Sequence, residues 1–352
     1  MEIINLIKIL APFALTFFIG IAITPILTHY LYKYKMWKKT VKSVGMAGGG
    51  TPIFSKLHAG KEIGTPKMGG VIIWASVFIA MFVIWIISEV APTELSTKLD
   101  FLSRNQTWLP LFTFTIGALV GLIDDWLEVS GKADYIAGGL SLKKRLGIVF
   151  VMGGIGAWWF FVKLGVASVL VPFVGEIFIG IWFIPFFIAV MLALYSSGVI
   201  DGIDGLAGGV FSLIYSAYGI IAFFQNQIDL AAFSFAIAGG LLAFLWFNIP
   251  PARFYMAETG SMALTVTLAV VAFLTGHVLL LPIIAFPLFA TVVSNIIQVG
   301  SKKFRSGKKV FQVAPIHHHF EAIGWPGYKV TMRYWIITAI FATMGVIIAL
   351  VG

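Results

Sequence analysis

Ten apolar stretches, each close to the length of a membrane-spanning helix, constrain this chain more than any other feature of its sequence. They lie near residues 6–32, 68–88, 109–123, 146–164, 178–199, 206–224, 230–249, 261–277, 278–298 and 334–351. A helix needs about 20 mainly apolar residues to cross the hydrocarbon core of a bilayer. Only 11% of the residues are charged, whereas soluble domains carry about 25%. We therefore expect an all-α, polytopic integral membrane protein with about ten transmembrane helices in a single domain, residues 1–352.

Two features predict departures from straight helices. Pro282 and Pro287 fall within the ninth stretch, and a proline inside a helix removes a backbone hydrogen bond, so this span is expected to be bent. Between the fourth and fifth stretches, residues 169–180 alternate apolar side chains around Val174-Gly175, which is typical of a short β-hairpin. We expect that hairpin on the outer surface.

The distribution of Lys and Arg predicts which way the helices cross, because cytoplasmic loops carry an excess of basic residues. If both termini lie outside, 20 of the 24 Lys and Arg residues fall on the cytoplasmic side. The loops on that side are 33–67, 124–145, 200–205, 250–260 and 299–333. The net charge of +9 then belongs to the cytoplasmic surface. Attraction to anionic lipid headgroups is the simplest explanation for many of these charges.

The unusual polar residues gather on the same predicted side. They are Asp124, Asp125, Asp201, Asp204, Asn248, Glu258, His317, His318 and His319. Each of these residues also has an ordinary structural explanation. For example, Asp-Gly-Xaa-Asp-Gly is a turn signature, and an acidic residue at a helix start interacts favourably with the helix dipole. Their common side nevertheless favours a joint role, and we expect the five carboxylates to meet in one cleft at the membrane surface.

Such a cleft suits phosphoryl transfer to a lipid. Carboxylates beside basic residues, in a chain without cysteine, favour a hard cation such as magnesium and a phosphate-bearing substrate. Two anionic phosphates repel each other by about 4 kcal/mol per pair of unit charges at ~4 Å and an effective dielectric of ~20. A metal ion and nearby cations offset that repulsion, while one carboxylate deprotonates or orients the attacking oxygen. Nothing in the sequence points to nucleic acid.

Five motifs follow one another in a fixed order. They are Gly64-Thr65-Pro66-Lys67-Met68-Gly69-Gly70, Asp124-Asp125, Asp201-Gly202-Ile203-Asp204-Gly205-Leu206-Ala207, Phe244-Leu245-Trp246-Phe247-Asn248 and Ala314-Pro315-Ile316-His317-His318-His319-Phe320-Glu321. In this order the chain resembles the phospho-N-acetylmuramoyl-pentapeptide transferase family, from about residue 33 to its end. The three histidines followed by Gly324-Trp325-Pro326 are the most specific element.

The resemblance implies a reaction. Undecaprenyl phosphate would attack the β-phosphate of UDP-N-acetylmuramoyl-pentapeptide and give UMP and the first lipid-linked peptidoglycan precursor, with Mg²⁺ as the cofactor. The protein would be a multi-pass enzyme of the bacterial inner (cytoplasmic) membrane with its active site facing the cytoplasm. Enzymes of this type can form homodimers, although the sequence has no interface signature.

The same resemblance implies roles for individual residues. Catalytic roles fall on Asp124, Asp125, Asp201, His317, His318 and His319, substrate binding on Lys61, Gly202, Asp204, Asn248 and Tyr255, and metal binding on Glu258 and Asp201. Asp124 is the expected general base, and Tyr255 is expected to stack on uracil.

Several positions depart from the family pattern. Tyr195 and Gly198 stand where the family usually has Asn, Glu258 where it has a magnesium-binding Asp, Lys67 where it has Thr, and Glu62 where it has Lys, with Lys61 as the neighbouring substitute. We expect these changes to alter substrate detail more than the class of reaction.

Two other functions are alternatives to this one. A related transferase could use another UDP-amino sugar. A membrane transporter would place its binding groups near the bilayer midplane, often within inverted repeats, and the sequence has neither feature. The third residue of the pentapeptide, and the choice between direct attack and an aspartyl-phosphate intermediate, stay open at this point.

Overall fold

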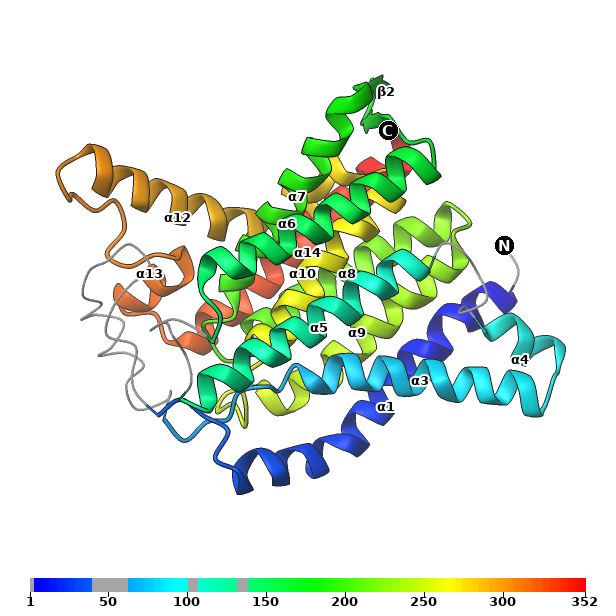
Figure 1. Cartoon of the computed structure of the whole chain (residues 1–352), viewed down its shortest axis with the longest axis horizontal. Coiled ribbons are helices and arrows are strands. Elements are labelled where there is room, and N and C mark those ends of the chain that lie inside the picture. The colour runs from blue at the N-terminus through cyan, green and yellow to red at the C-terminus, as the bar shows by residue number, and fades with distance from the viewer. Residues whose placement is uncertain (1–2, 40–62, 101–106, 132–138) are drawn as a thin grey trace.

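The computed structural model of the chain describes residues 3–39, 63–100, 107–131 and 139–352. Most of these residues lie in helices that pack side by side (Figure 1). The long helices are α1 (Ile3–Lys33), α3 (Val71–Val90), α5 (Trp108–Val129), α6 (Leu142–Trp158), α7 (Phe183–Ser197), α8 (Leu206–Phe224), α9 (Ile228–Asn248), α10 (Ala257–Leu274), α12 (Phe286–Phe304) and α14 (Gly327–Val351). The short elements are α4 (Glu94–Leu99), α11 (Leu281–Ile284), α13 (Ile316–Ala322), β1 (Ser168–Val171) and β2 (Gly175–Phe178).

The prediction of about ten membrane-spanning helices is confirmed. Within the described residues, nine helical segments are long and apolar enough to cross a bilayer, and a bent pair supplies a tenth if it is counted as one span. That pair joins Val278–Ile284 to Phe286–Phe304 at an angle of 86°. Pro287 lies in the first turn of α12, where its missing N–H leaves no helical bond unmade. The ninth span is therefore bent as expected, and α12 leaves the bundle as an arm (Figure 1).

The expected hairpin is also present. β1 and β2 pair antiparallel with Val171 opposite Gly175, and Gly175 adopts φ 103°, which glycine tolerates without a steric cost. The hairpin, the start of α1 and the end of α14 lie toward the same end of the bundle (Figure 1). There the N–H of Phe173 donates to the carbonyl oxygen of Gly352 at 3.4 Å. Which side of the membrane this end faces stays a prediction.

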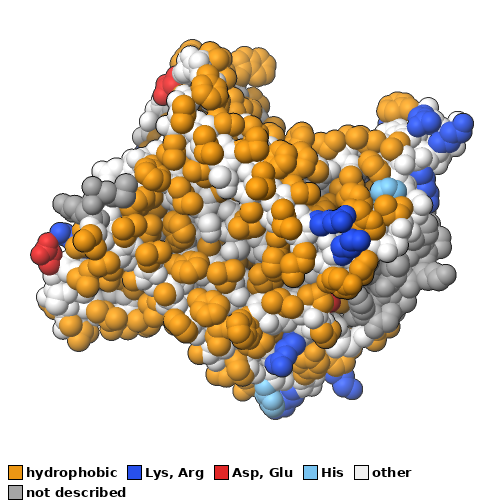
Figure 2. Space-filling view, turned by 180° about the vertical axis from the view of Figure 1, so that it is seen from behind, with side chains coloured by type: hydrophobic (Ala, Val, Ile, Leu, Met, Phe, Trp, Pro, Cys, Tyr) orange, Lys and Arg blue, Asp and Glu red, His pale blue; other side chains and the backbone are white. Residues whose placement is uncertain are grey.

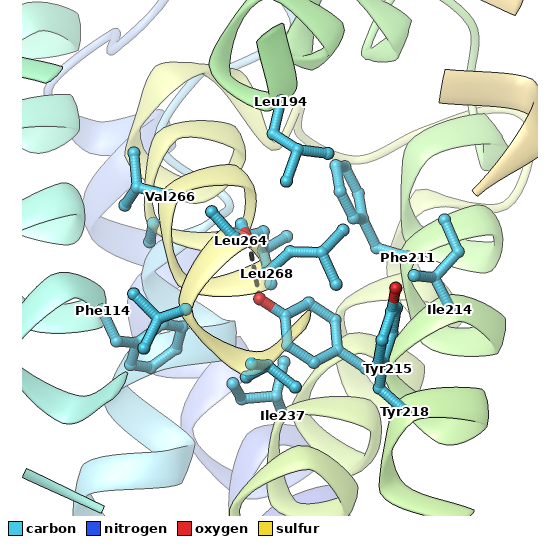
Figure 3. Packing of buried hydrophobic residues seen from close by; sticks show 14 of the residues in the cluster. Phe114, Leu194, Phe211, Ile214, Tyr215, Tyr218, Ile237, Leu264, Val266 and Leu268 are labelled. Atoms are coloured by element: carbon cyan, nitrogen blue, oxygen red, sulfur yellow. Dashed lines mark hydrogen bonds between the residues drawn. The ribbon is translucent and has the colours of Figure 1, made fainter. Parts of the chain in front are cut away.

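Helices α8, α9 and α10 form the centre of the bundle, and most of their residues are buried. The tyrosine hydroxyls at this centre are paired within it. Tyr215 donates to the carbonyl oxygen of Leu264 at 2.6 Å, and Tyr218 donates to that of His277 at 3.2 Å. Figure 3 places Tyr215 among apolar side chains from α5, α8 and α10. Since an unpaired polar group in a membrane costs several kcal/mol, this closed packing favours a stable bundle.

The outer surface is mainly apolar (Figure 2). Large side chains such as Phe18, Ile296 and Ile336 are each more than 60% exposed. Most Lys and Arg side chains on the face in Figure 2 lie toward the end that carries α12 and α13. A soluble monomer rarely exposes so large an apolar area, so lipid covers the sides of the bundle.

Candidate active site

The end of α5 lies directly against the beginning of α10. A Cβ atom at Gly121 would come within 2.1 Å of the carbonyl oxygen of Glu258, so the two helices approach this closely only because residue 121 has no side chain. Asp124 and Asp125 follow one helical turn later on α5. The contact therefore brings both aspartates beside Glu258, although the two segments are more than 130 residues apart in sequence.

Asp125 is fully buried, and both of its carboxylate oxygens are bound. Oδ1 lies 3.1 Å from Nζ of Lys67. Oδ2 accepts hydrogen bonds from the backbone N–H of Thr259 at 2.8 Å and from its hydroxyl at 2.7 Å. These charge-assisted bonds hold Asp125 in one orientation.

Lys67 also binds Glu128, which lies one helical turn beyond Asp125. Glu128 in turn lies 3.5 Å from Nζ of Lys38. Burial alone would lower the pKa of Lys67, but the carboxylates of Asp125 and Glu128 outweigh burial and hold that pKa well above its usual value. Lys67 is therefore a permanent positive charge within the acidic cluster.

Asp124 is also fully buried but is less completely paired. Its Oδ1 accepts a hydrogen bond from the N–H of Leu140 at 2.7 Å. Its Oδ2 lies 3.9 Å from Nη1 of Arg145, beyond hydrogen-bond distance, and has no hydrogen-bond partner among the described residues. Buried polar atoms are nearly always paired, so an exception marks a place for a proton, a metal ion or a substrate atom.

Arg145 links α6 to the start of α10, because its Nη1 donates to Oε1 of Glu258 at 2.5 Å. The Arg145 side chain is 4% exposed and that of Glu258 27%. In the sequence, Arg145 is only one of several basic residues of a loop predicted to face the cytoplasm. The sequence did contain a signal for its burial, because Arg145 shares a helical spacing with the apolar residues Val149 and Met152. The structure buries all three.

The Asp201-to-Gly205 turn adds two further carboxylates. Asp201 Oδ2 accepts from the N–H of Ala257 at 2.8 Å, and Asp204 Oδ2 accepts from that of Ala252 at 3.2 Å. Burial raises the pKa of Asp201 to about 6, against the Ala257 hydrogen bond and Lys67, and the charges of Asp125 and Asp204 add to the rise. The carboxylates of Asp125, Asp201 and Asp204 therefore influence one another electrostatically.

Asn248 and Tyr255 shape the loop beside this turn. The Asn248 side chain accepts from the N–H of Gly205 at 2.9 Å and donates to the carbonyl oxygen of Phe254 at 2.8 Å. Its amide is therefore engaged at both ends within the protein, and it holds the turn and the loop together. Tyr255 is half-buried, and its N–H donates to the carbonyl oxygen of Pro66 at 2.8 Å.

Two of the three predicted histidines reach the acidic turn. A Cβ at Gly202 would lie 2.5 Å from Nε2 of His318 and 2.9 Å from Nε2 of His317, so both rings press on this glycine. Nδ1 of His318 lies 2.8 Å from Oε2 of Glu321. His319 instead contacts the segment before α13, where its Nδ1 accepts from the N–H of Gln312 at 3.3 Å. Lys61 lies outside the described residues.

The acidic cluster suits magnesium that is also bound by substrate. Glu258 and Asp201 each have a second carboxylate oxygen beyond the one bound by Arg145 or Ala257, and Asp124 Oδ2 has no hydrogen bond from the described residues. In the described part of the chain, no group of three or more acidic or His side chains could enclose a metal ion alone. Magnesium usually takes only one or two protein carboxylates and completes its shell with water and phosphate oxygens. The residues present fit such an ion.

Comparison with known proteins gives matches over most of the chain. A family model described as glycosyl transferase family 4 matches residues 107–276. The phospho-N-acetylmuramoyl-pentapeptide-transferase of Listeria innocua is 34% identical over 349 residues, which are 98% of this chain and 99% of that protein. The protein of the same name from Chloroflexus aurantiacus is 34% identical over 305 residues, 82% of this chain and 78% of that protein.

Proposed function

The chain belongs to the phospho-N-acetylmuramoyl-pentapeptide transferase family, and we propose on that premise that it makes the first lipid-linked precursor of peptidoglycan. A phosphate oxygen of undecaprenyl phosphate forms a bond to the β-phosphorus of UDP-N-acetylmuramoyl-pentapeptide. The bond from that phosphorus to the bridging oxygen breaks, and UMP leaves with the electron pair. The membrane-embedded bundle, with its acidic cluster where α5 ends and α10 begins, suits one lipid substrate and one water-soluble substrate.

The observation that carries this proposal is the difference between two adjacent aspartates. Asp125 has both carboxylate oxygens bound, whereas Oδ2 of the buried Asp124 has no hydrogen-bond partner among the described residues. A general base needs an oxygen within hydrogen-bond reach of the substrate proton. We assign this role to Asp124, which takes the remaining proton of the lipid phosphate as the new bond forms.

The nucleotide sugar occupies the neighbouring turn and loop in this proposal. His317 and His318, which press on Gly202, border its sugar-phosphate end. Tyr255 stacks on uracil beside Asp204. Asn248 supports that pocket by fixing the backbone at Gly205, since both ends of its amide are already bound.

Magnesium dependence is a further part of the proposal. Glu258 and Asp201 would hold the ion through their carboxylate oxygens, and Arg145 keeps Glu258 in position. A bound magnesium ion supplies positive charge that offsets the repulsion between the two phosphates. Glutamate reaches one methylene further than the aspartate typical of the family, so the loop before α10 sets the distance.

The orientation proposed is an outward-facing pair of termini and a cytoplasmic active site in the bacterial inner membrane. The basic loops support it through the excess of Lys and Arg on one side. The chain has no cysteine, so Ser306→Cys creates a unique label site. In intact cells an impermeant thiol reagent should leave this cysteine unmodified and should label it only after lysis. Labelling of this cysteine in intact cells would show that the opposite orientation is correct.

Release of UMP tests the reaction itself. Purified protein in detergent, given undecaprenyl phosphate, magnesium and UDP-N-acetylmuramoyl-pentapeptide, should release UMP and form a lipid-linked product. A parallel reaction with UDP-N-acetylglucosamine should release none. UMP release from the second nucleotide sugar only would replace this proposal with the related transferase.

A further inference from the structure

Lys67 is a cation buried among the carboxylates of the site. Its side chain is 14% exposed, and its ammonium group lies between Asp125 and Glu128 on α5. The family resembled by the sequence usually has threonine at this position, so Lys67 departs from the usual pattern. A buried lysine is retained at low cost only when it is paired, and here two carboxylates pair with it.

The backbone around Lys67 is fixed to two other parts of the chain, the segment after α1 and the loop before α10. The N–H of Lys67 donates to the carbonyl oxygen of Met36 at 2.8 Å. On either side, Pro66 accepts from the N–H of Tyr255 and Gly69 donates to its carbonyl oxygen, both at 2.8 Å. These bonds attach the segment before α3 to the loop before α10. The backbone that carries Lys67 is therefore held in place, and its ammonium group has a fixed position beside Asp125.

The rigid backbone around Lys67 helps to fix the carboxylate of Asp125. Lys67 binds one carboxylate oxygen, and Thr259 binds the other through its N–H and hydroxyl. Asp124 next to it retains an unpaired oxygen within the described structure. Lys67 thus offsets the negative charge of Asp125 and leaves Oδ2 of Asp124 available to other groups.

We propose that Lys67 is a positioning residue and an internal cation of this site, which fixes the Asp125 carboxylate and weakens the attraction of the acidic cluster for divalent metal ions. The proposal deepens the transferase function described above and rests on it for the catalytic consequence. Its metal-binding consequence follows from charge alone. A positive charge held near a divalent ion opposes binding of that ion, and its removal strengthens binding.

Metal binding in the absence of both substrates provides the first measurement. Titration of the purified protein with Mn²⁺, with the free ion followed by its paramagnetic resonance signal, compares the parent with Lys67→Met. Loss of one positive charge from the site should tighten Mn²⁺ binding about threefold to tenfold. Lys67→Arg retains the charge and should bind Mn²⁺ like the parent. The matched control is Lys38→Met, because Lys38 contacts Glu128 from a more exposed position and its loss should change the affinity less.

Turnover provides the second measurement and moves in the opposite direction. Lys67→Met should lower kcat about tenfold, within the range expected when a supporting residue of an active site is lost, and should leave KM for the nucleotide sugar nearly unchanged. Lys67→Arg should recover most of the turnover. Tighter Mn²⁺ binding together with slower turnover separates this role from simple misfolding, which would weaken both.

Glu128→Gln keeps the test decisive if Lys67→Met does not fold. It leaves the Lys67–Asp125 contact in place and removes one negative charge, so Mn²⁺ should bind about threefold to tenfold more weakly. The double variant Lys67→Met with Glu128→Gln should return to the parental affinity. Parental Mn²⁺ affinity in Glu128→Gln and in any folded Lys67→Met protein would overturn the inference. Failure of the parent to release UMP would instead overturn the proposed function and leave these affinities measurable.

Discussion

The middle of the helix bundle and its acidic end share helix α10 but differ in how their polar groups are paired. In the middle, the hydroxyl of Tyr215 on α8 is paired with a carbonyl oxygen of α10. At the end, Oδ2 of Asp124 and Nε of Arg145 are buried without hydrogen-bond partners in the described structure. The hydroxyl of Tyr215 is thus satisfied by the protein itself, whereas these two atoms of the acidic end can still bind groups of a substrate or a metal ion. We therefore expect the centre to provide stability and the acidic end to provide the chemistry.

Energetics make this contrast informative. An unpaired buried polar group costs about 1–3 kcal/mol, which the well-packed centre can offset. The two regions should therefore respond differently to substitution. Changes at the acidic end should affect activity more than stability, and changes in the centre should do the reverse.

The largest effect is expected for Asp124→Asn. Asparagine can still accept the hydrogen bond from Leu140 but cannot take a proton, so turnover should fall by about 10²–10⁴. Binding of the nucleotide sugar should change little. Initial rates of UMP release and equilibrium binding of the nucleotide sugar check both expectations. Near-parental turnover would remove Asp124 from the mechanism.

Glu258→Gln should have the next largest effect. The amide keeps the shape but loses the charge that would bind magnesium, so the variant should lose turnover or need about tenfold more magnesium for half-maximal rate. Glu258→Asp keeps the charge and should retain part of the activity. Turnover measured against magnesium concentration decides between the roles. If Glu258→Gln titrates like the parent, Glu258 serves only to pair with Arg145 and to favour the start of α10.

The smallest effect is expected for Tyr215→Phe, which probes the middle of the bundle. Loss of the hydroxyl removes one buried hydrogen bond, worth about 0.5–1.5 kcal/mol of the free energy of unfolding. Thermal unfolding in detergent should show a small decrease in midpoint temperature, while the rate of UMP release at low temperature stays parental. A drop in activity without a change in stability would contradict the separation of the two regions.

Hydrophobicity alone predicted most of the fold. The predicted spans follow from the length of the apolar stretches, and the bend of the ninth follows from Pro287, which can begin α12 but has no N–H with which to continue α11. The short hairpin followed from its alternating pattern and Gly175. Hydrophobicity works well here because lipid allows few alternatives to a complete helix.

The pairing within the site could not be obtained in the same way. The Arg145–Glu258 contact depends on how α6 and α10 face each other, and these residues are 113 positions apart. The direction of His319 depends on the segment before α13. Motifs identified Asp124, Asp125 and Glu258 as candidates, and the comparisons confirm the family. The roles of these residues stay predictions until variants are measured.

Gly121 gives the site a genetic signature that its chemistry would not suggest. The spacing between α5 and α10 is determined at a position with no side chain, where even a methyl group would collide with the backbone of Glu258. In a screen for loss of function, substitutions at this glycine should therefore appear alongside those at the aspartates. Such a result could be misread as evidence for a reactive group at residue 121, when what the site requires there is the absence of a side chain.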